Sequence, residues 1–155
     1  MYSVWLTKRE QEVWRKFLTV TSRLQTEMHR QLQRDCELSL ADYEVLVALS
    51  ERGPQRINDL ADALAWEQSR LSHQLRRMRV RGLLERYGNG DDRRGASVSI
   101  TDAGLAALKT AAPGHAELVR RTVFEGLTPA QLRGFDEVLQ SVLERLAATN
   151  PPRRR

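Results

Sequence analysis

The first long pattern in the chain is helical and covers residues 7–34. This stretch contains no Gly or Pro, and its apolar residues, among them Phe17, Met28 and Leu32, recur at intervals of three or four. Such spacing places them on one face of an amphipathic helix. This helix is too long for the core of a single subunit of this size to cover its whole apolar face. We therefore expect part of that face to contact another chain.

A capping box marks the start of a second helix. Ser39 supplies the N-cap hydroxyl, and Asp42 follows at the third helical position. Residues 43–49 are mostly apolar, which predicts a largely buried helix. Gly53 and Pro54 then end it, because Gly adopts the left-handed conformation at low cost and Pro cannot continue a helix.

Two short helices joined by a tight turn are predicted next. Asn58 is expected to be the N-cap of the first, and residues 65–67 form the break between the two. The second helix covers about residues 68–81, and Gly82 ends it. Its predicted buried face consists of Leu71, Leu75 and Met78.

Beyond Gly82 the pattern changes from helix to strand. Residues 83–87 and 96–100 predict two strands, and the segment between them, residues 88–95, is rich in turn formers and charge. This arrangement is typical of a β-hairpin with an extended loop.

Two further helices are predicted to complete the chain. Thr101 caps a helix that Pro113-Gly114 should kink or interrupt, and Thr128 opens a capping box for the last helix. The fold class is therefore mainly α with a small β-hairpin wing, a winged helix-turn-helix with N- and C-terminal dimerisation helices. We expect residues 1–36 to belong to the dimerisation region, 37–101 to form the winged helix-turn-helix module, and 102–155 to hold the C-terminal dimerisation helices and a basic tail.

Composition excludes several classes of protein. A chain of 155 residues that is 41% hydrophobic is typical of a globular protein, and a single cysteine cannot form an internal disulfide. No apolar run is long enough to span a membrane, and the first residues do not resemble a signal peptide. We therefore expect a cytoplasmic protein without a membrane partner.

The net charge of +5 is unevenly distributed. Residues 53–101 carry nine basic and six acidic side chains, whereas residues 8–52 are neutral and residues 102–152 carry a net −1. A basic middle between nearly neutral arms indicates a binding surface for a polyanion.

The polar side chains of the second short helix predict which polyanion this surface binds. An α-helix fits the major groove of DNA, where Gln, Ser and Arg hydrogen-bond to base edges. Arg93 and Arg94, on the hairpin loop, are suited to a narrow minor groove. The alternative, a merely solvated basic face, is disfavoured by the order of helix, turn, helix, strand, basic loop and strand. The predicted DNA-facing residues of the helix are Gln68, Ser69, Arg70, Ser72, His73, Arg76 and Arg77.

Residues 38–108 resemble the core of the MarR (multiple antibiotic resistance regulator) family. The resemblance rests on Leu60-Ala61, Ser69-Arg70-Leu71-Ser72, Arg81-Gly82-Leu83-Leu84, Asp92-Arg93-Arg94-Gly95 and Ile100-Thr101-Asp102-Ala103-Gly104. It implies a homodimeric transcriptional regulator of a palindromic operator on double-stranded DNA, commonly a repressor released by a small aromatic or lipophilic acid. It also implies that Asp92 orients Arg94 towards the DNA.

Other candidate sites are weaker. Trp14, Phe17, Tyr43 and Leu46 could line an effector pocket, although aromatic residues at helical spacing are more often core. Cys36 could act as a redox sensor, but it is predicted to follow the end of the first helix, and its acidic neighbours favour the less reactive thiol. The three histidines lack metal-binding spacing, no cofactor motif is present, and no set of residues predicts an enzyme.

Two alternative functions stay open at this stage. An architectural protein would bind DNA with little preference among sequences, and a protein-interaction module would use the winged fold as a scaffold.

Overall fold

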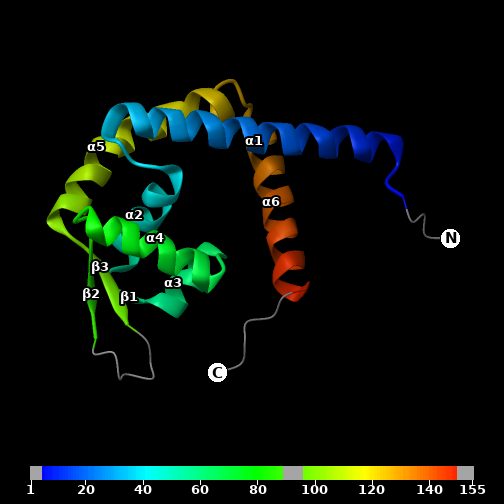
Figure 1. Cartoon of the computed structure of the whole chain (residues 1–155). Coiled ribbons are helices and arrows are strands. Elements are labelled where there is room, and N and C mark those ends of the chain that lie inside the picture. Colours follow the sequence, from blue (N-terminus) through cyan, green and yellow to red (C-terminus); the bar gives the residue numbers. More distant parts are fainter. Residues whose placement is uncertain (1–4, 89–95, 150–155) are drawn as a thin grey trace. The chain divides into compact units, whose positions relative to one another are not determined.

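The computed structural model describes residues 5–88 and 96–149. They form two compact units, Met1–Ala116 and Glu117–Arg155. The elements in chain order (Figure 1) are α1 Lys8–Cys36, α2 Leu40–Arg52, β1 Gln55–Arg56, α3 Ile57–Leu64, α4 Gln68–Val80, β2 Leu84–Tyr87, β3 Ser97–Ile100, α5 Asp102–Val119, a π-helical turn Arg120–Phe124 and α6 Pro129–Thr149. The predicted mainly α fold with a winged helix-turn-helix is confirmed.

The first two helices begin as their sequences predict. Thr7 and Glu10 form a capping box at the start of α1, and Ser39 and Asp42 form another at the start of α2. The end of α1 differs from the prediction, because Cys36 is the last residue of the helix and does not lie beyond it. The left-handed conformation of Glu37, with φ of 57°, ends the helix there.

The sheet has three strands in the order β1-β3-β2, all antiparallel. The pairs Leu84 with Ile100 and Tyr87 with Ser97 set the register of the predicted hairpin. The two-residue strand β1 is too short to leave a pattern in the sequence. It leads directly into α3, whose N-cap is Arg56, so the prediction that Asn58 caps this helix is wrong.

The core of the first unit is built around α2, which contacts α1, α3, α4 and β3. The predicted inward face of α4 is confirmed, because Leu71, Leu75 and Met78 are all buried. Burying one such side chain contributes about 1.5–3 kcal/mol. This packing fixes which sides of α4 remain exposed. The largest fully buried side chains are Leu32, Leu38, Leu46, Leu49, Leu60, Leu71, Met78 and Val45.

Helix α5 begins at the predicted place but continues further. The Thr101 hydroxyl accepts a hydrogen bond from the Gly104 amide, as expected of a cap. The predicted interruption at Pro113 is wrong, because α5 runs through this exposed residue to Val119. A solvent-exposed Pro leaves a carbonyl one turn earlier that water can satisfy. The π-helical turn then follows, where the Glu125 amide donates to the Arg120 carbonyl at 2.8 Å.

Each unit presents apolar side chains that its own core does not cover. On α1 these lie towards the N-terminus, and on α6 none of the described residues is buried. In the described ranges, no helix combines the length and apolar character needed to cross a membrane. The exposed apolar residues of α1 are Val13, Trp14, Phe17, Leu18 and Val20, and those of α6 are Leu132, Phe135, Val138, Leu139, Val142, Leu143 and Leu146.

Candidate nucleic-acid interface

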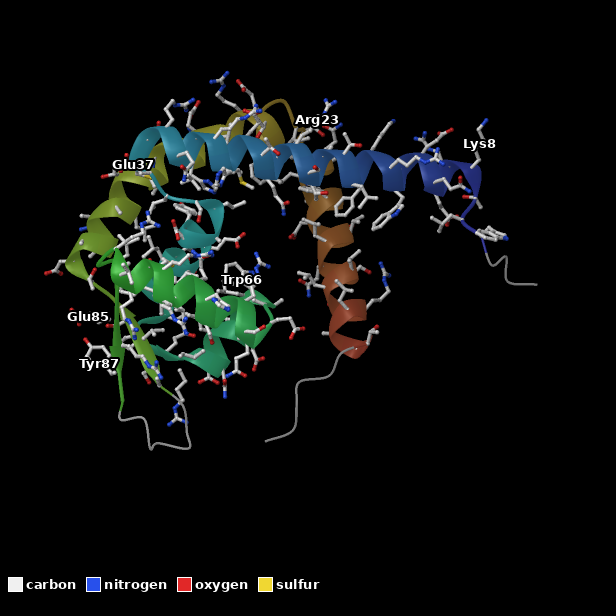
Figure 2. All side chains as sticks on the ribbon, viewed as in Figure 1. Lys8, Arg23, Glu37, Trp66, Glu85 and Tyr87 are labelled. Atoms are coloured by element: carbon white, nitrogen blue, oxygen red, sulfur yellow. The ribbon has the colours of Figure 1, made fainter. Side chains whose placement is uncertain are left out.

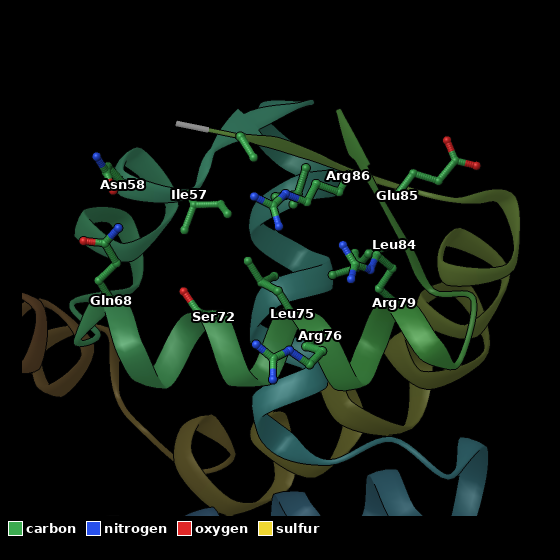
Figure 3. Close-up of a pocket in the computed structure, with 12 residues that line it drawn as sticks. Ile57, Asn58, Gln68, Ser72, Leu75, Arg76, Arg79, Leu84, Glu85 and Arg86 are labelled. Carbon is green, nitrogen blue, oxygen red and sulfur yellow. The ribbon is translucent and has the colours of Figure 1, made fainter. Parts of the chain in front are cut away.

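Helix α4 presents one exposed side to the hairpin. Four residues at helical spacing on this side, here called the wing-side residues, are Gln68, Ser72, Arg76 and Arg79. Together with residues of α3, β2 and β3 they line a cavity of about 380 Å³. Figure 3 shows Arg76 and Arg79 on α4 and Arg86 on β2, and all three line this cavity.

This cavity is electropositive. Arg76, Arg79 and Arg86 contribute three guanidinium groups, and none of them forms a hydrogen bond or ion pair with a described residue. Among the described residues of the lining, Glu85 is the one carboxylate, and it accepts a hydrogen bond of 2.8 Å from the Tyr87 hydroxyl. Guanidinium groups gathered in a concave surface attract phosphate and can form two parallel hydrogen bonds with it.

A second side of α4 faces α2. Arg70, Gln74, Arg77 and Arg81 recur at intervals of four, three and four, so they lie on one stripe of the helix, and we call them the α2-side residues. The side chains of the α2-side residues form hydrogen bonds or ring contacts within the module, whereas those of the wing-side arginines form none with the described residues.

The buried carboxylate of Asp42 is the centre of this attachment. Gln74 Nε2 donates to Asp42 Oδ1 at 2.5 Å, and Arg81 Nη1 donates to Asp42 Oδ2 at 2.7 Å. Arg81 also donates to the Glu37 carbonyl at 2.9 Å, and Arg77 Nη2 donates to Gln74 Oε1 at 2.6 Å. Asp42 and Gln74 are both almost fully buried, at 3% and 4% exposure. This network holds α4 against α1 and α2.

Arg70 is held differently. Its guanidinium lies over the indole ring of Trp66, 4.1 Å from the ring centroid, in a cation–π contact. Trp66 belongs to the turn between α3 and α4 (Figure 2). In this structure Arg70 is therefore stacked on Trp66, on the side of α4 that faces away from the wing.

The structure thus divides the predicted DNA-facing residues into three groups. Gln68, Ser72 and Arg76 face the wing, Ser69 and His73 lie exposed on the outer surface of α4, and Arg70 and Arg77 are α2-side residues. The predicted wing residues Asp92, Arg93 and Arg94 lie outside the described residues.

Two arginines of the cavity, Arg79 and Arg86, were not among the predicted site residues. Arg79 follows Ser72 and Arg76 at helical spacing, so its position could have been found from the sequence. Arg86 lies on β2, and only the packing of the strand beside α4 brings its side chain to the same cavity.

The predicted effector residues are not brought together. Leu46 is fully buried in the core, whereas Trp14 and Phe17 are about half exposed and stack on each other with ring centroids 5.6 Å apart. Tyr43 alone of the four lines a second cavity, of about 440 Å³. The lining of this cavity consists of Met28, Leu40, Tyr43, Glu44, Val47, Ala48, Glu51, Arg52, Ala63, Leu64, Trp66 and His115.

Burial changes the ionisation of three groups in this second cavity. It raises the pKa of the Glu44 carboxyl and of the Tyr43 hydroxyl, and it lowers the pKa of His115. The His115 ring lies 4.4 Å from the Tyr43 ring, and its buried Nδ1 atom has no hydrogen-bond partner in the described part of the chain. His115 is therefore neutral near pH 7.

The single cysteine is engaged with its own helix. The Cys36 thiol is partly buried and donates to the Leu32 carbonyl at 3.1 Å.

The helix-turn-helix formed by α3 and α4, followed by a β-hairpin and an arginine-lined cavity between helix and hairpin, defines a winged-helix DNA-binding protein. The model of the MarR family matches residues 38–95. AbsC, a MarR family transcriptional regulator of Streptomyces coelicolor, is 38% identical, with a TM-score of 0.86 over 94% of this chain and 99% of its own. This chain belongs to the MarR family of transcriptional regulators.

Two further relatives are similar in sequence. Sco3205, a MarR family regulator of Streptomyces coelicolor solved in complex with DNA, is 38% identical, with a TM-score of 0.85 over 92% of this chain and 94% of its own. The transcriptional repressor IacR of Pseudomonas putida is 28% identical over 121 residues, which are 78% of this chain and 72% of IacR. DNA binding and transcription regulation follow from membership of the family.

Proposed function

We propose that the protein is a homodimeric repressor that binds a palindromic operator. The observation that carries the proposal is the wing-side cavity, in which Arg76, Arg79 and Arg86 converge without a partner among the described residues. A structural role would pair such arginines with carboxylates. Their open arrangement between a recognition helix and a wing suits contact with a nucleic acid.

The division of α4 suggests how the operator is read. Gln68, Ser69, Ser72 and Arg76 belong to the half of the helix that enters the major groove, where they hydrogen-bond to base edges. Arg79 and Arg86 bind phosphate oxygens, which set the register of the protein on the duplex. By family resemblance, Asp92 holds Arg94 towards the DNA, and Arg93 and Arg94 enter the minor groove.

The homodimer is supported by the apolar faces of α1 and α6. Leu143 is 61% exposed and Val138 is 60% exposed, and α6 carries five further exposed large apolar side chains. A contiguous apolar surface of this kind is typical of a subunit interface. Twofold symmetry would place the two recognition helices about 34–36 Å apart, which predicts an operator of roughly 16–20 base pairs.

A selection of bound sequences from a random DNA pool tests the proposal. We expect one palindromic site, bound on the order of 10³-fold more tightly than random DNA, and a matched selection with Arg76→Ala should lose preference at one position in each half-site. Binding without a sequence preference would identify an architectural protein instead. Unchanged binding by both Arg76→Ala and Arg94→Ala would favour a protein-interaction module.

Regulation by a small molecule is supported by the second cavity. Its volume of about 440 Å³ falls in the range of sites for small ligands, and it lies between α2, the α3–α4 turn and His115 of α5. A ligand bound there would contact the segment that carries the recognition helix. We infer that this cavity is the effector site.

A further inference from the structure

The effector cavity contains a carboxylate, that of Glu44, to which no described residue is bonded. Glu44 is partly buried in its lining, and its carboxylate forms no hydrogen bond or ion pair with a described residue. Burial raises the pKa of this carboxyl, which means that its charged form is poorly solvated. A cation placed beside Glu44 would relieve this cost.

The same wall of the cavity already holds a cation. Arg70 places its guanidinium 4.1 Å above the centroid of Trp66, a residue of the lining, and its positive charge acts on Glu44 by lowering the pKa of the carboxyl. Arg70 stays beyond ion-pair distance of Glu44, since no ion pair joins the two. The geometry around Trp66 and Glu44 is therefore that of a cation site which a side chain of the protein fills only in part.

We propose that the cavity binds a cationic aromatic ligand whose ammonium group lies between Glu44 and the Trp66 ring and takes the place of Arg70. This proposal rests on the effector site proposed above and names its ligand class. The charge differs from that of the aromatic acids that the family resemblance implies.

The other lining residues are consistent with this ligand. Among the lining residues, Glu51 and Arg52 carry opposite charges and His115 is neutral. The charge of Glu44 therefore makes the net charge of these lining residues negative. Tyr43 and Leu64 offer apolar surface for an aromatic ring. The buried Nδ1 atom of His115 forms no hydrogen bond with any residue that the structure describes, and it supplies a polar contact for a ring substituent.

Displacement of Arg70 would connect the ligand to the DNA. Arg70 belongs to the first turns of α4, the recognition helix, so its release from Trp66 changes the charged surface that this helix presents. The ligand and the operator then act on each other's affinity by the same factor. In a chain with Arg70→Gln, this factor should fall to one.

Two probes with the same ring and opposite charge test the ligand class. These are 2-phenylethylamine and phenylacetate, titrated into the full chain carrying Trp5→Phe and Trp14→Phe, so that Trp66 is the one remaining tryptophan and its fluorescence reports on the site. We expect the amine to bind about tenfold more tightly than the acid. Glu44→Gln should abolish this preference, whereas Glu27→Gln, an exposed acid on α1, should leave it unchanged.

Arg70→Gln supplies the discriminating result. Because the competing guanidinium is then absent, we expect the amine to bind several-fold more tightly than it binds the parent chain. Equal or tighter binding of phenylacetate, no binding of the amine at millimolar concentration, or an affinity unaffected by Arg70→Gln would overturn the proposal. Operator binding is measured separately without a probe, so a failure of the DNA-binding function is distinguished from a failure of this ligand assignment.

Discussion

Asp42 of α2 and Arg81, the residue that ends the recognition helix, form an ion pair of 2.7 Å. The Asp42 side chain is 4% exposed and that of Arg81 is 42% exposed, so the carboxylate is the buried partner. Asp42 also accepts from Gln74 and from the Ser39 amide. One carboxylate therefore caps α2 and fixes the orientation of α4.

Removal of this carboxylate should destabilise the fold. Asp42→Ala leaves the buried Gln74 amide without an acceptor, and we expect a loss of about 2–3 kcal/mol in the free energy of unfolding, measured with urea. Arg81→Ala should also destabilise the fold, by about 1–3 kcal/mol, because it leaves the buried Asp42 carboxylate without its counter-ion. The control is Asp62→Ala at an exposed position of α3. Equal costs for Asp42→Ala and the control would contradict the role of Asp42.

The two sides of α4 should contribute differently to DNA binding. Arg76→Ala should weaken operator binding by about 1–3 kcal/mol, and Arg79→Ala should reduce the slope of log affinity against log salt by about one. Arg77→Ala, which removes a side chain tied to Gln74, is the matched variant and should have a smaller effect on affinity. Fluorescence anisotropy at several salt concentrations measures all three. A larger effect of Arg77→Ala than of Arg76→Ala would reverse the assignment of the reading side.

Gly104 is required where α5 passes the end of α4. A Cβ atom at this position would meet the Leu83 carbonyl and lie 2.9 Å from Ile100 Cγ1. Gly104→Ala should therefore destabilise the protein by about 1–3 kcal/mol. At Gly134 of α6 a Cβ atom would meet nothing within 4 Å, so Gly134→Ala should stabilise by up to about 1 kcal/mol through helix propensity. Thermal unfolding of the two variants provides the comparison, and shifts in the same direction would refute it.

Stability should decrease in mild acid because of His115. Burial holds the pKa of this residue below its ordinary value of 6.5, so the unfolded chain binds the proton more readily than the folded protein does. The stabilising contribution is complete above pH 6.5 and is lost as the pH falls below it. His115→Phe, which retains a ring against Tyr43, should flatten this part of the profile. An identical pH dependence in the variant, measured by urea unfolding, would exclude His115 as the cause.

The apolar face of α6 should control the oligomeric state. Leu143 is 61% exposed in the single chain, so Leu143→Glu should leave the fold of one subunit intact and convert a dimer into a monomer. Glu137→Gln on the same helix is the control. Sedimentation velocity distinguishes the two states, and a variant that remains dimeric would place the interface elsewhere.

Most of the local structure was predictable from the sequence because it depends on near neighbours. The capping boxes at Thr128 and Ser39 are confirmed, and so is the inward face of α4 at Leu71, Leu75 and Met78. The positions that were predicted wrongly have tertiary causes. Pairing of β1 with β3 brings the chain into α3 without an Asn58 cap, and exposure of Pro113 allows α5 to continue.

The sequence by itself determined that a basic helix follows a tight turn and precedes a hairpin, because hydrophobic period, caps and turn residues are local signals. Only the tertiary structure decided which arginines of that helix are open and which are tied. Arg76 and Arg77 are neighbours with the same side chain, yet Arg76 faces the wing and Arg77 is bound to Gln74. The difference arises because Asp42, 32 residues before Gln74 in the chain, is buried against one side of α4. Contacts across such a distance depend on how the helices pack, and the local pattern of residues does not contain that information.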